Sequence, residues 1–387
     1  MKREKIQLRF RFFCMVFFHR KTKLKPDDGG KTPNMVLNQG GKKMKKVVAV
    51  IMASVFAFSL AAGCKKSEDK KETQAESKTE SKADETKAES KAASGELIKV
   101  GIINNDPNES GYRTANDADL KAMFTKENGY DASFSYSLKN DEQIQFAKTF
   151  IQNEVDYLLL SAADTAGWDS VLQDAKNAGV KVILFDRTID ADPSLYEASI
   201  VSDMDKEGQT AVDWLASQNL SEYKVIHIQG VMGSAAQQGR SGALDKKVAA
   251  EANWTIVKQQ TAEWNAEKAQ QIVQSVIDSG EKFNVIYAEN DDMAKGAVAA
   301  LDAAGISHGV GKDVLVMGFD CNKWALEELL KQNWNYDGQC NPFQASYIDS
   351  IIKDIEAGKT PEKKIIMDEK GFDAATIKQE DVDKYGI

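Results

Sequence analysis

From Leu97 onward, short apolar runs alternate with longer amphipathic segments. The runs richest in Val, Ile and Leu are 97–103, 157–161, 180–186, 223–230, 284–290 and 314–320, and two more mixed runs, 131–138 and 254–261, are typical of edge strands. Segments of helical length lie between them, at 111–127, 140–153, 168–178, 205–219, 240–251, 265–279, 291–304 and 343–357. Continuous apolar strands separated by helices predict parallel sheets covered on both faces. The predicted fold class is therefore α/β, with doubly wound parallel sheets.

This α/β segment is long enough to form two lobes. Residues 97–387 exceed the usual size of a single domain, so more than one hydrophobic core is expected. One strand–helix series stops near Ser202-Asp203, and the next begins there. We therefore expect a first lobe at 97–203 and a second lobe at 204–338, each with its own strands.

An apolar run at residues 47–64 precedes the α/β segment. It starts after Met44-Lys45-Lys46 and ends at Leu60-Ala61-Ala62-Gly63-Cys64. Small residues before a cysteine suit a lipoprotein signal peptidase, and the thiol is the nucleophile that accepts a diacylglyceryl chain. A transmembrane anchor or a buried helix is the alternative, but the run is short for a span of about 20 apolar residues. We interpret 44–63 as a lipoprotein signal peptide and Cys64 as the lipidated residue, which predicts an extracytoplasmic protein anchored to the cell membrane.

The segments on either side of this signal show no pattern of a fold. Residues 1–43 are basic and aromatic, and Gly40-Gly41 would be encoded by GGN-GGN, which resembles a ribosome-binding sequence before Met44. We hypothesise that 1–43 is a non-native upstream extension, with an unusually long signal n-region as the alternative. Residues 64–96 repeat Glu-Ser-Lys and can form no apolar face, so we expect a flexible tether.

Charge distinguishes the leader from the rest of the chain. The whole chain has a formal charge of −9, but residues 1–63 hold 14 basic and 3 acidic residues, which leaves −20 for residues 64–387. An acidic body of this kind argues against nucleic acid or an anionic membrane surface as the main partner. It suits a solute that is neutral or recognised by local contacts.

Cysteine and histidine are scarce in the α/β segment. Cys321 and Cys340 can form a disulfide, which an extracytoplasmic compartment permits, or remain as buried thiols, and the sequence leaves both possibilities open. Only His227 and His308 lie beyond the leader, and no Cys-x-x-Cys pair occurs. We therefore expect no metal site of ordinary zinc spacing and no cofactor.

Polar and aromatic residues gather where the predicted strands end, which is where ligands bind in open parallel sheets. These residues are Glu109, Tyr112, Arg113, Asp186 and Arg187 in the first lobe and Arg240, Trp264, Asn290 and Asp320 in the second. Hydroxyl groups both donate and accept hydrogen bonds, so such side chains suit a polyol. The C–H face of a sugar ring also stacks on aromatic rings.

Each of these features has a purely structural alternative. Asp186-Arg187 could be a simple ion pair, Gly230-x-x-Gly233 a tight turn, and Asp291-Asp292 a charge that favours a helix start. Their recurrence at strand ends in both halves of the chain favours a binding site.

At residues 97–365 the chain resembles periplasmic solute-binding proteins of the ribose/galactose type, the receptors of sugar ABC importers. Within that family it is most similar to the galactofuranose-binding subgroup. The motifs that carry the resemblance are Glu109-Ser110-Gly111-Tyr112-Arg113, Thr165-Ala166-Gly167-Trp168, Phe185-Asp186-Arg187-Thr188-Ile189-Asp190, Asn290-Asp291-Asp292-Met293 and Gly318-Phe319-Asp320.

The resemblance implies two hinged lobes whose nine strand-end residues contact a sugar, with Gln339 added at a hinge crossing. It also implies that 339–360 holds a crossing and a helix that returns to the first lobe, and that 361–387 holds a further crossing and a tail. Ser161 and Trp168 are candidates to shape the pocket, with helix-start packing as the alternative for Trp168. Tyr112 replaces a Trp of the subgroup and Gln339 replaces a Glu, so the identity of the sugar stays open.

The expected function is therefore that of a monomeric, lipid-anchored receptor. It would close its lobes around a galactofuranose-, ribose- or galactose-like monosaccharide and present it to the permease subunits of an ABC importer, without catalysing a reaction. A sugar sensor for a chemotaxis or kinase receptor is the main alternative. A glycan-processing enzyme is a weaker one, because the sequence has no Ser-His-Asp, P-loop or metal motif. A transcription regulator would need a helix-turn-helix where the charged tether stands.

Overall fold

The computed structural model describes residues 95–387. The predicted upstream extension, the signal peptide, Cys64 and nearly all of the tether lie outside these residues. Among the helices of the described part, none combines the length and the apolar composition needed to cross a bilayer.

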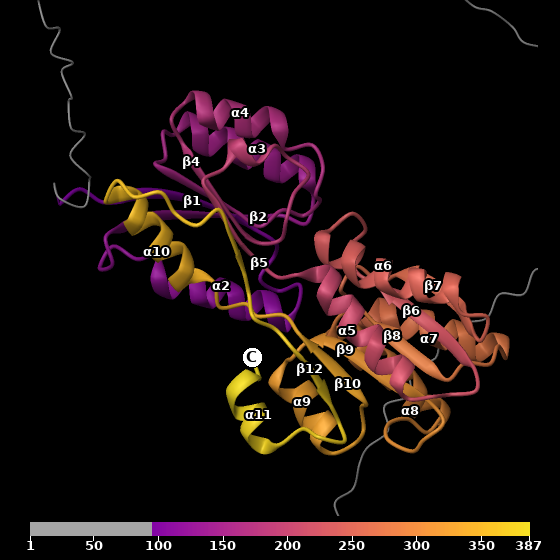
Figure 1. The fold of residues 1–387 in the computed structure, drawn as a ribbon. Helices are drawn as coiled ribbons and strands as arrows, with labels where there is room; N and C mark the ends of the chain where they lie inside the picture. Colours follow the sequence, from indigo (N-terminus) through magenta and orange to yellow (C-terminus); the bar gives the residue numbers. More distant parts are fainter. Residues whose placement is uncertain (1–94) are drawn as a thin grey trace, which may run out of the picture. The chain divides into compact units, whose positions relative to one another are not determined.

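Two α/β lobes, each built on a six-stranded sheet, make up the described chain (Figure 1). The first lobe begins with β1 (Ile98–Asn104), α2 (Gly111–Met123), β2 (Tyr130–Tyr136), α3 (Asn140–Gln152), β3 (Tyr157–Leu160), α4 (Asp169–Asn177), β4 (Lys181–Asp186), the 3-10 helix η1 (Pro193–Leu195) and β5 (Ala198–Val201). The second lobe follows with α5 (Met204–Ser217), β6 (Tyr223–Gln229), α6 (Ala235–Ala250), β7 (Trp254–Thr261), α7 (Ala266–Ser279), β8 (Val285–Ala288), α8 (Asp291–Ala304), β9 (Leu315–Asp320), α9 (Lys323–Leu330) and β10 (Tyr336–Gln339). The chain ends with α10 (Ala345–Glu356), β11 (Lys364–Ile366), β12 (Gly371–Asp373) and α11 (Gln379–Tyr385).

Both sheets are parallel, as predicted, apart from one edge strand. The first sheet has the order β11-β5-β4-β3-β1-β2 and the second β12-β10-β9-β8-β6-β7, in which β12 is antiparallel to β10. The strand order reverses beside β1 in the first sheet and beside β6 in the second. Ligands bind outside the carboxyl ends of strands at such reversals. The predicted fold class is thus confirmed.

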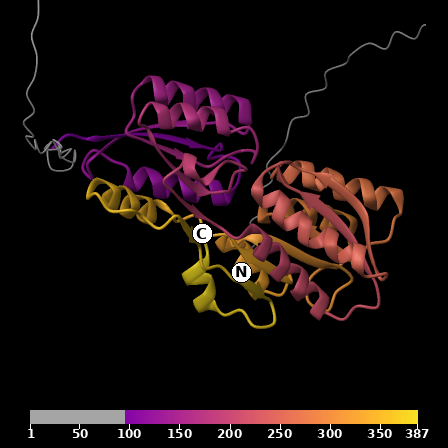
Figure 2. The same cartoon turned by 45° about the horizontal axis from the view of Figure 1, so that its top comes forward.

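Helices cover both faces of each sheet (Figure 2), which explains why the central strands are continuously apolar. In β3, Tyr157 and Leu159 pack in the core formed with α2 and α10, whereas Leu158 and Leu160 pack in the core formed with α3 and α4. The second lobe repeats this arrangement with α5 and α6 on one face and α7, α8 and α9 on the other. Each sheet is therefore packed between two helical layers, and its strand ends emerge from a continuous core.

The chain passes between the lobes three times, at residues 202–203, 340–344 and 367–370. After the second passage, α10 packs on the first-lobe core through Ala345, Ile348 and Ile352. β11 then extends the first sheet beside β5, and β12 returns to the second sheet beside β10. The last passage lies against the first, because Met367 N donates to Val201 O at 3.0 Å.

Several short elements were not predicted, namely β5, β10, β11, β12, α9 and α11. In addition, α6 begins at Ala235, five residues before the predicted start at 240. The reason is local: the Ser234 hydroxyl accepts a hydrogen bond from Gln237 N at 3.3 Å and caps the helix there.

Candidate functional site

The predicted site residues occupy strand ends and the helix starts that follow them. Ser110 caps α2 by accepting a hydrogen bond from Arg113 N at 3.2 Å, so Tyr112 and Arg113 lie in the first helical turn beyond β1. Asn290 caps α8 in the same way, with its side-chain oxygen 2.9 Å from Met293 N. The amide nitrogen of Asn290 is then the group that remains for a ligand.

One small cavity of about 20 Å³ lies among these residues and is walled by both lobes. Nine of the ten predicted site residues line it: Glu109, Tyr112, Arg113, Asp186, Arg187, Arg240, Trp264, Asn290 and Asp320. A space of this volume holds only one or two water molecules, so a sugar can enter only when the lobes or the lining side chains move apart. The wall thus combines carboxylates, guanidinium groups, an amide and two aromatic rings around one narrow space between the lobes.

Gln339, the tenth predicted residue, lies outside this cavity. It is the last residue of β10 and lines a neighbouring pocket together with Asp203, Glu207 and Glu369. Successive side chains of an extended segment point in opposite directions, and the next residue, Cys340, lines the cavity in its place. A direct contact between Gln339 and a ligand in this cavity therefore has no geometric support.

Asp186 is the centre of the first-lobe wall. Its carboxylate receives Arg113 Nη2 at 2.9 Å and the Ser161 hydroxyl at 2.6 Å on Oδ2, and the Tyr112 hydroxyl at 2.9 Å on Oδ1. Burial by itself would raise the pKa of Asp186, but Arg113 and Arg187 outweigh it and hold the pKa below its ordinary value. Asp186 is thus fixed in place as an ionised acceptor.

Like Asp186, Arg113 is fixed by several polar contacts, whereas one oxygen of Glu109 has none among the described residues. Arg113 Nη1 donates to Asn104 Oδ1 at 2.9 Å, and its Nε lies 3.5 Å from Glu109 Oε2. The other Glu109 oxygen is buried and has no hydrogen-bond partner among residues 95–387. Burial raises the pKa of Glu109, although Arg113 and Arg187 oppose the shift. This oxygen is the acceptor that a ligand hydroxyl could satisfy.

Arg240 organises the second-lobe wall. Its Nε donates to Glu207 Oε2 at 2.8 Å, its Nη2 lies 3.4 Å from Asp320 Oδ1, and its Nη1 donates to the carbonyl of Glu289. Burial raises the pKa of Asp320 well above its ordinary value, against the opposing effect of Arg240. Asp320 therefore takes up a proton more readily than Asp186 does on the facing wall.

Trp264 provides a ring surface in the cavity. Its buried indole nitrogen has no hydrogen-bond partner within the described part of the chain, and the guanidinium of Arg187 lies 6.0 Å from the ring centroid. Gly230 makes room for the ring, because a Cβ atom at Gly230 would lie 1.9 Å from it. The Gly230-x-x-Gly233 turn therefore has a packing role tied directly to the cavity wall.

Three cavity residues have backbone conformations that side-chain-bearing residues rarely adopt. Their φ angles are 65° at Asp186, 65° at Trp264 and 106° at Asp320. Such conformations are strained and persist only where the surroundings enforce them, which is frequent at functional sites. All three residues lie at or just after a strand end, where the chain turns its side chain toward the cavity.

The lobes also contact each other beside the cavity. Gly111 N donates to Asp292 Oδ2 at 3.1 Å, and Thr165 N donates to Gly233 O at 3.2 Å. A side chain at Gly111 would collide with Asn322, because its Cβ would lie 1.7 Å from Asn322 Oδ1. The absence of a side chain at Gly111 thus permits this close approach.

Each remaining candidate either holds a cavity residue in place or packs in the hydrophobic core. Ser161 supports Asp186 through the hydrogen bond given above, whereas Trp168 is fully buried in the core with α3 and α4 and donates to Asp164 O at 2.9 Å. Cys321 and Cys340 are free, buried thiols. Four lining residues were missed by the sequence reasoning, which had no chemical signal for them: Ser110, Met204, Ala236 and Cys340.

Comparison with known proteins places this architecture in a family. A family described as "Periplasmic binding protein domain" matches residues 100–348. The fructose import binding protein FruE of Bifidobacterium longum is 31% identical over 288 residues, which cover 72% of this chain and 86% of that protein. The galactofuranose-binding protein YtfQ of Escherichia coli is 28% identical over 261 residues, with 66% and 81% covered.

A solved structure agrees with these matches. A protein from Mycobacterium smegmatis in complex with β-D-fucofuranose is 29% identical and superposes with a TM-score of 0.67, covering 72% of this chain and 92% of that one. The residues that the family matches, 100–348, include all nine cavity residues that the sequence pointed to and leave out only the edge strands β11 and β12 of the two sheets. The chain therefore belongs to the periplasmic binding protein family.

Proposed function

We propose that this protein binds a monosaccharide in its furanose ring form between the two lobes and delivers it to an ABC importer. The observation that carries the proposal is the cavity shared by both lobes, which nine strand-end residues line. Binding needs no bond to be made or broken, because closure of the lobes is sufficient to enclose and hand over the guest.

The two walls offer complementary partners for hydroxyl groups. The first lobe presents the ionised Asp186, the unpartnered oxygen of Glu109 and two guanidinium groups. The second lobe presents Asn290, Asp320 and the indole of Trp264. A hydroxyl can accept from an arginine while donating to a carboxylate, and the C–H face of the ring can stack on the indole.

The furanose form is suggested by relatives. YtfQ is named for galactofuranose, the Mycobacterium smegmatis structure contains β-D-fucofuranose, and FruE is named for fructose, a sugar that also forms five-membered rings. Analogues that lack a hydroxyl would leave buried groups of the wall unpaired, and this gives the site its selectivity.

Attachment to the membrane through Cys64 is part of the same proposal. It is supported by the apolar run 47–64 and the small residues before Cys64, followed by a charged tract of tether composition. A tethered receptor stays close to the importer even though the two bind only transiently.

Isothermal titration calorimetry of the purified protein tests the binding proposal. The panel comprises galactose, arabinose, fructose and ribose together with methyl glycosides locked in furanose or pyranose form. We expect saturable one-to-one binding, with the furanosides preferred. Asp186→Asn should weaken binding by about 10- to 100-fold, because hydrogen bonds to a charged group contribute ~1.5–3 kcal/mol.

Asp174→Asn is the matched control, because it makes the same change at an exposed position on α4. It should leave the affinity unchanged. Equal affinities for wild type and Asp186→Asn, with both proteins folded, would place the sugar elsewhere.

A further inference from the structure

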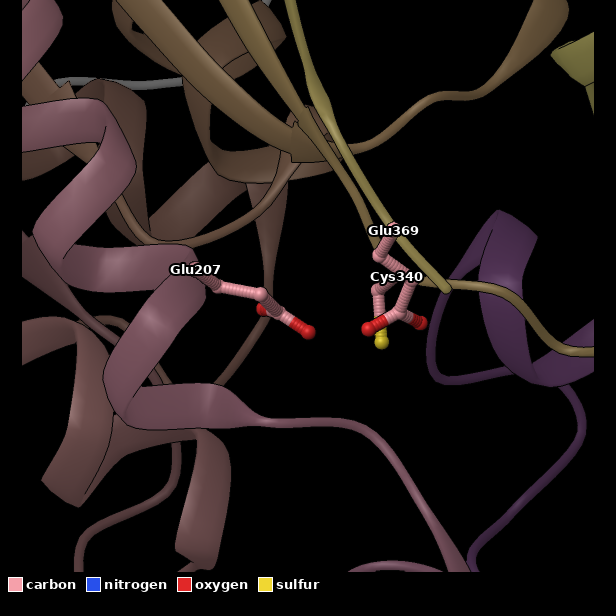
Figure 3. A group of neighbouring side chains, drawn as sticks. All are labelled: Glu207, Cys340 and Glu369. Carbon is pink, nitrogen blue, oxygen red and sulfur yellow. The ribbon is translucent and has the colours of Figure 1, made fainter. Parts of the chain in front are cut away.

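A second cluster of reactive side chains lies where the lobes are joined, beside the sugar cavity, and one of its members, Cys340, also lines that cavity. Glu207 lies on α5 just after the first passage, Cys340 lies in the second passage, and Glu369 lies in the third. One potential ligand atom of each lies within 4.8 Å of the others, and the Glu207 carboxylate points toward Cys340 and Glu369 (Figure 3). Residues from all three connections therefore meet at one point.

Each carboxylate is oriented through one oxygen only. Glu207 Oε2 receives both Nε and Nη2 of Arg240, at 2.8 and 2.7 Å, whereas Glu207 Oε1 is buried and has no hydrogen-bond partner among the described residues. Glu369 Oε1 accepts from the Ser202 hydroxyl at 2.7 Å and from Asn341 N at 2.6 Å, which leaves Oε2 for another partner. Outer hydrogen bonds that fix one oxygen of a ligating carboxylate are typical of built metal sites.

The cluster also lacks positive charge. Among the described residues, Arg240 is the one cation that forms an ion pair with this cluster. Arg240 also forms an ion pair with Asp320. Glu207 is only 7% exposed and Cys340 only 3%. Buried acidic groups need a compensating partner, so the unpartnered oxygen of Glu207 has an electrostatic reason to face a cation.

The donor set selects the kind of cation. A cysteine sulfur beside two carboxylates favours a borderline or soft ion such as Zn²⁺ over Ca²⁺ or Mg²⁺, which prefer oxygen alone. Three protein ligands with a fourth position left for water suit tetrahedral Zn²⁺. A pocket lined by Lys206, Gln339 and Lys370 also reaches Glu207 and Glu369, and it provides a route from solvent separate from the sugar cavity.

We propose that Glu207, Cys340 and Glu369 form a Zn²⁺ site that ties together the three passages between the lobes. Local spacing could not reveal this site, because its ligands come from three distant parts of the sequence. A metal bound here would stabilise the arrangement of the passages seen in this structure and bias the equilibrium between lobe orientations.

The test uses the full-length purified protein, stripped with a chelator and titrated with Zn²⁺ in competition with a chromophoric chelator. Co²⁺ serves as a spectroscopic probe, because a cobalt–thiolate bond gives a charge-transfer band in the near ultraviolet. We expect one equivalent of Zn²⁺, a higher melting temperature on binding, and the cobalt band. Ca²⁺ and Mg²⁺ should not raise the melting temperature.

Matched variants identify the ligands. Cys340→Ser should abolish the cobalt band, and Cys321→Ser, which alters the other buried thiol, should retain it. Glu369→Gln should weaken Zn²⁺ binding at least tenfold, whereas the exposed Glu362→Gln should not. Ser202→Ala should weaken binding by about tenfold through the outer hydrogen bond.

Several outcomes would overturn the proposal. These are the absence of a cobalt band in the wild type, an unchanged band in a folded Cys340→Ser protein, or equal stabilisation by Ca²⁺. If Cys340→Ser does not fold, Glu369→Gln and the wild-type cobalt spectrum decide the question.

Discussion

Arg113 Nη2 and Asp186 Oδ2 lie 2.9 Å apart, and each side chain is 2% exposed. This contact joins the first turn of α2 to the carboxyl end of β4, two elements that flank the cavity. A buried ion pair contributes little net stability, but removing one partner is costly because the other charge remains buried. The pair therefore fixes the geometry of the site more than it stabilises the lobe.

Arg113→Met should lower the free energy of unfolding by about 3–5 kcal/mol, since Asp186 would lose its main counter-charge. The double variant Arg113→Met/Asp186→Asn should be less destabilised than Arg113→Met alone, because no strong charge is left unpaired. Denaturant unfolding followed by circular dichroism measures both values. A double variant as unstable as the sum of the two single variants would show that the two residues act independently.

Gly230→Ala should weaken sugar binding through Trp264. The new Cβ would lie 1.9 Å from the ring, so the indole must shift out of its position in the cavity wall. Overpacking of this kind costs ~1–3 kcal/mol. If about 1.4 kcal/mol of that cost falls on the sugar-bound state, the affinity for the sugar drops about tenfold. Titration calorimetry gives the change in affinity.

Gly242→Ala is the control for that substitution. Gly242 lies in α6 and its Cβ would meet nothing within 4 Å, so this change should leave affinity intact and stabilise the helix slightly. If Gly230→Ala binds as tightly as Gly242→Ala, the position of Trp264 does not matter for binding.

The stability of the second lobe should fall as the pH rises above about 4, the ordinary range for an aspartate. Burial raises the pKa of Asp337 and of Asp291 well above that range; repulsion from Asp320 adds to the shift of Asp337, and repulsion from Asp337 adds to that of Asp291. The folded state therefore holds more protons than the unfolded state in this window, so raising the pH favours unfolding.

Asp337→Asn should reduce this pH dependence, because an amide can donate toward Asp291 without any titration. Urea unfolding of wild type and variant between pH 5 and pH 8 measures the two slopes. Asp174→Asn should keep the wild-type slope. An Asp337→Asn protein with the wild-type slope would mean that Asp337 is already ionised across this range.

Cys64 should carry the lipid. Cells grown with an alkyne-tagged fatty acid should label the wild-type protein and release a mature chain that starts at Cys64, whereas Cys64→Ala should remain unlabelled. Mass spectrometry of the native precursor should find no peptide from residues 10–40. Detection of such a peptide would contradict the hypothesis that residues 1–43 are an upstream extension.

Much of the fold could be predicted from apolar runs. Strands such as β3 and β4 are buried on both faces, so their composition alone distinguishes them from the amphipathic helices between them. β11 and β12 are only three residues long, and the equally short β5 and β10 lack the continuous apolar run of β3, since β5 reads Ala-Ser-Ile-Val and β10 reads Tyr-Asp-Gly-Gln. By contrast, α9 was overlooked although Ala325, Leu326 and Leu329 follow helical spacing.

The site was predictable where topology dictated it. Parallel strands bring their carboxyl ends to one edge, so Asp186 and Asp320 meet a common cavity although they are far apart in sequence. Gln339 rested on resemblance alone, and it lines the neighbouring pocket instead of the cavity. The link between Glu207, Cys340 and Glu369 depends on how the three passages cross, which no local pattern records.

The most direct test of the account is a crystal structure with the sugar that calorimetry selects. We predict one furanose ring in the cavity, hydrogen-bonded to Asp186 and Arg113 from the first lobe and to Asn290 or Asp320 from the second, with one face on Trp264. A sugar held by a single lobe, or bound at a surface away from these residues, would contradict the account.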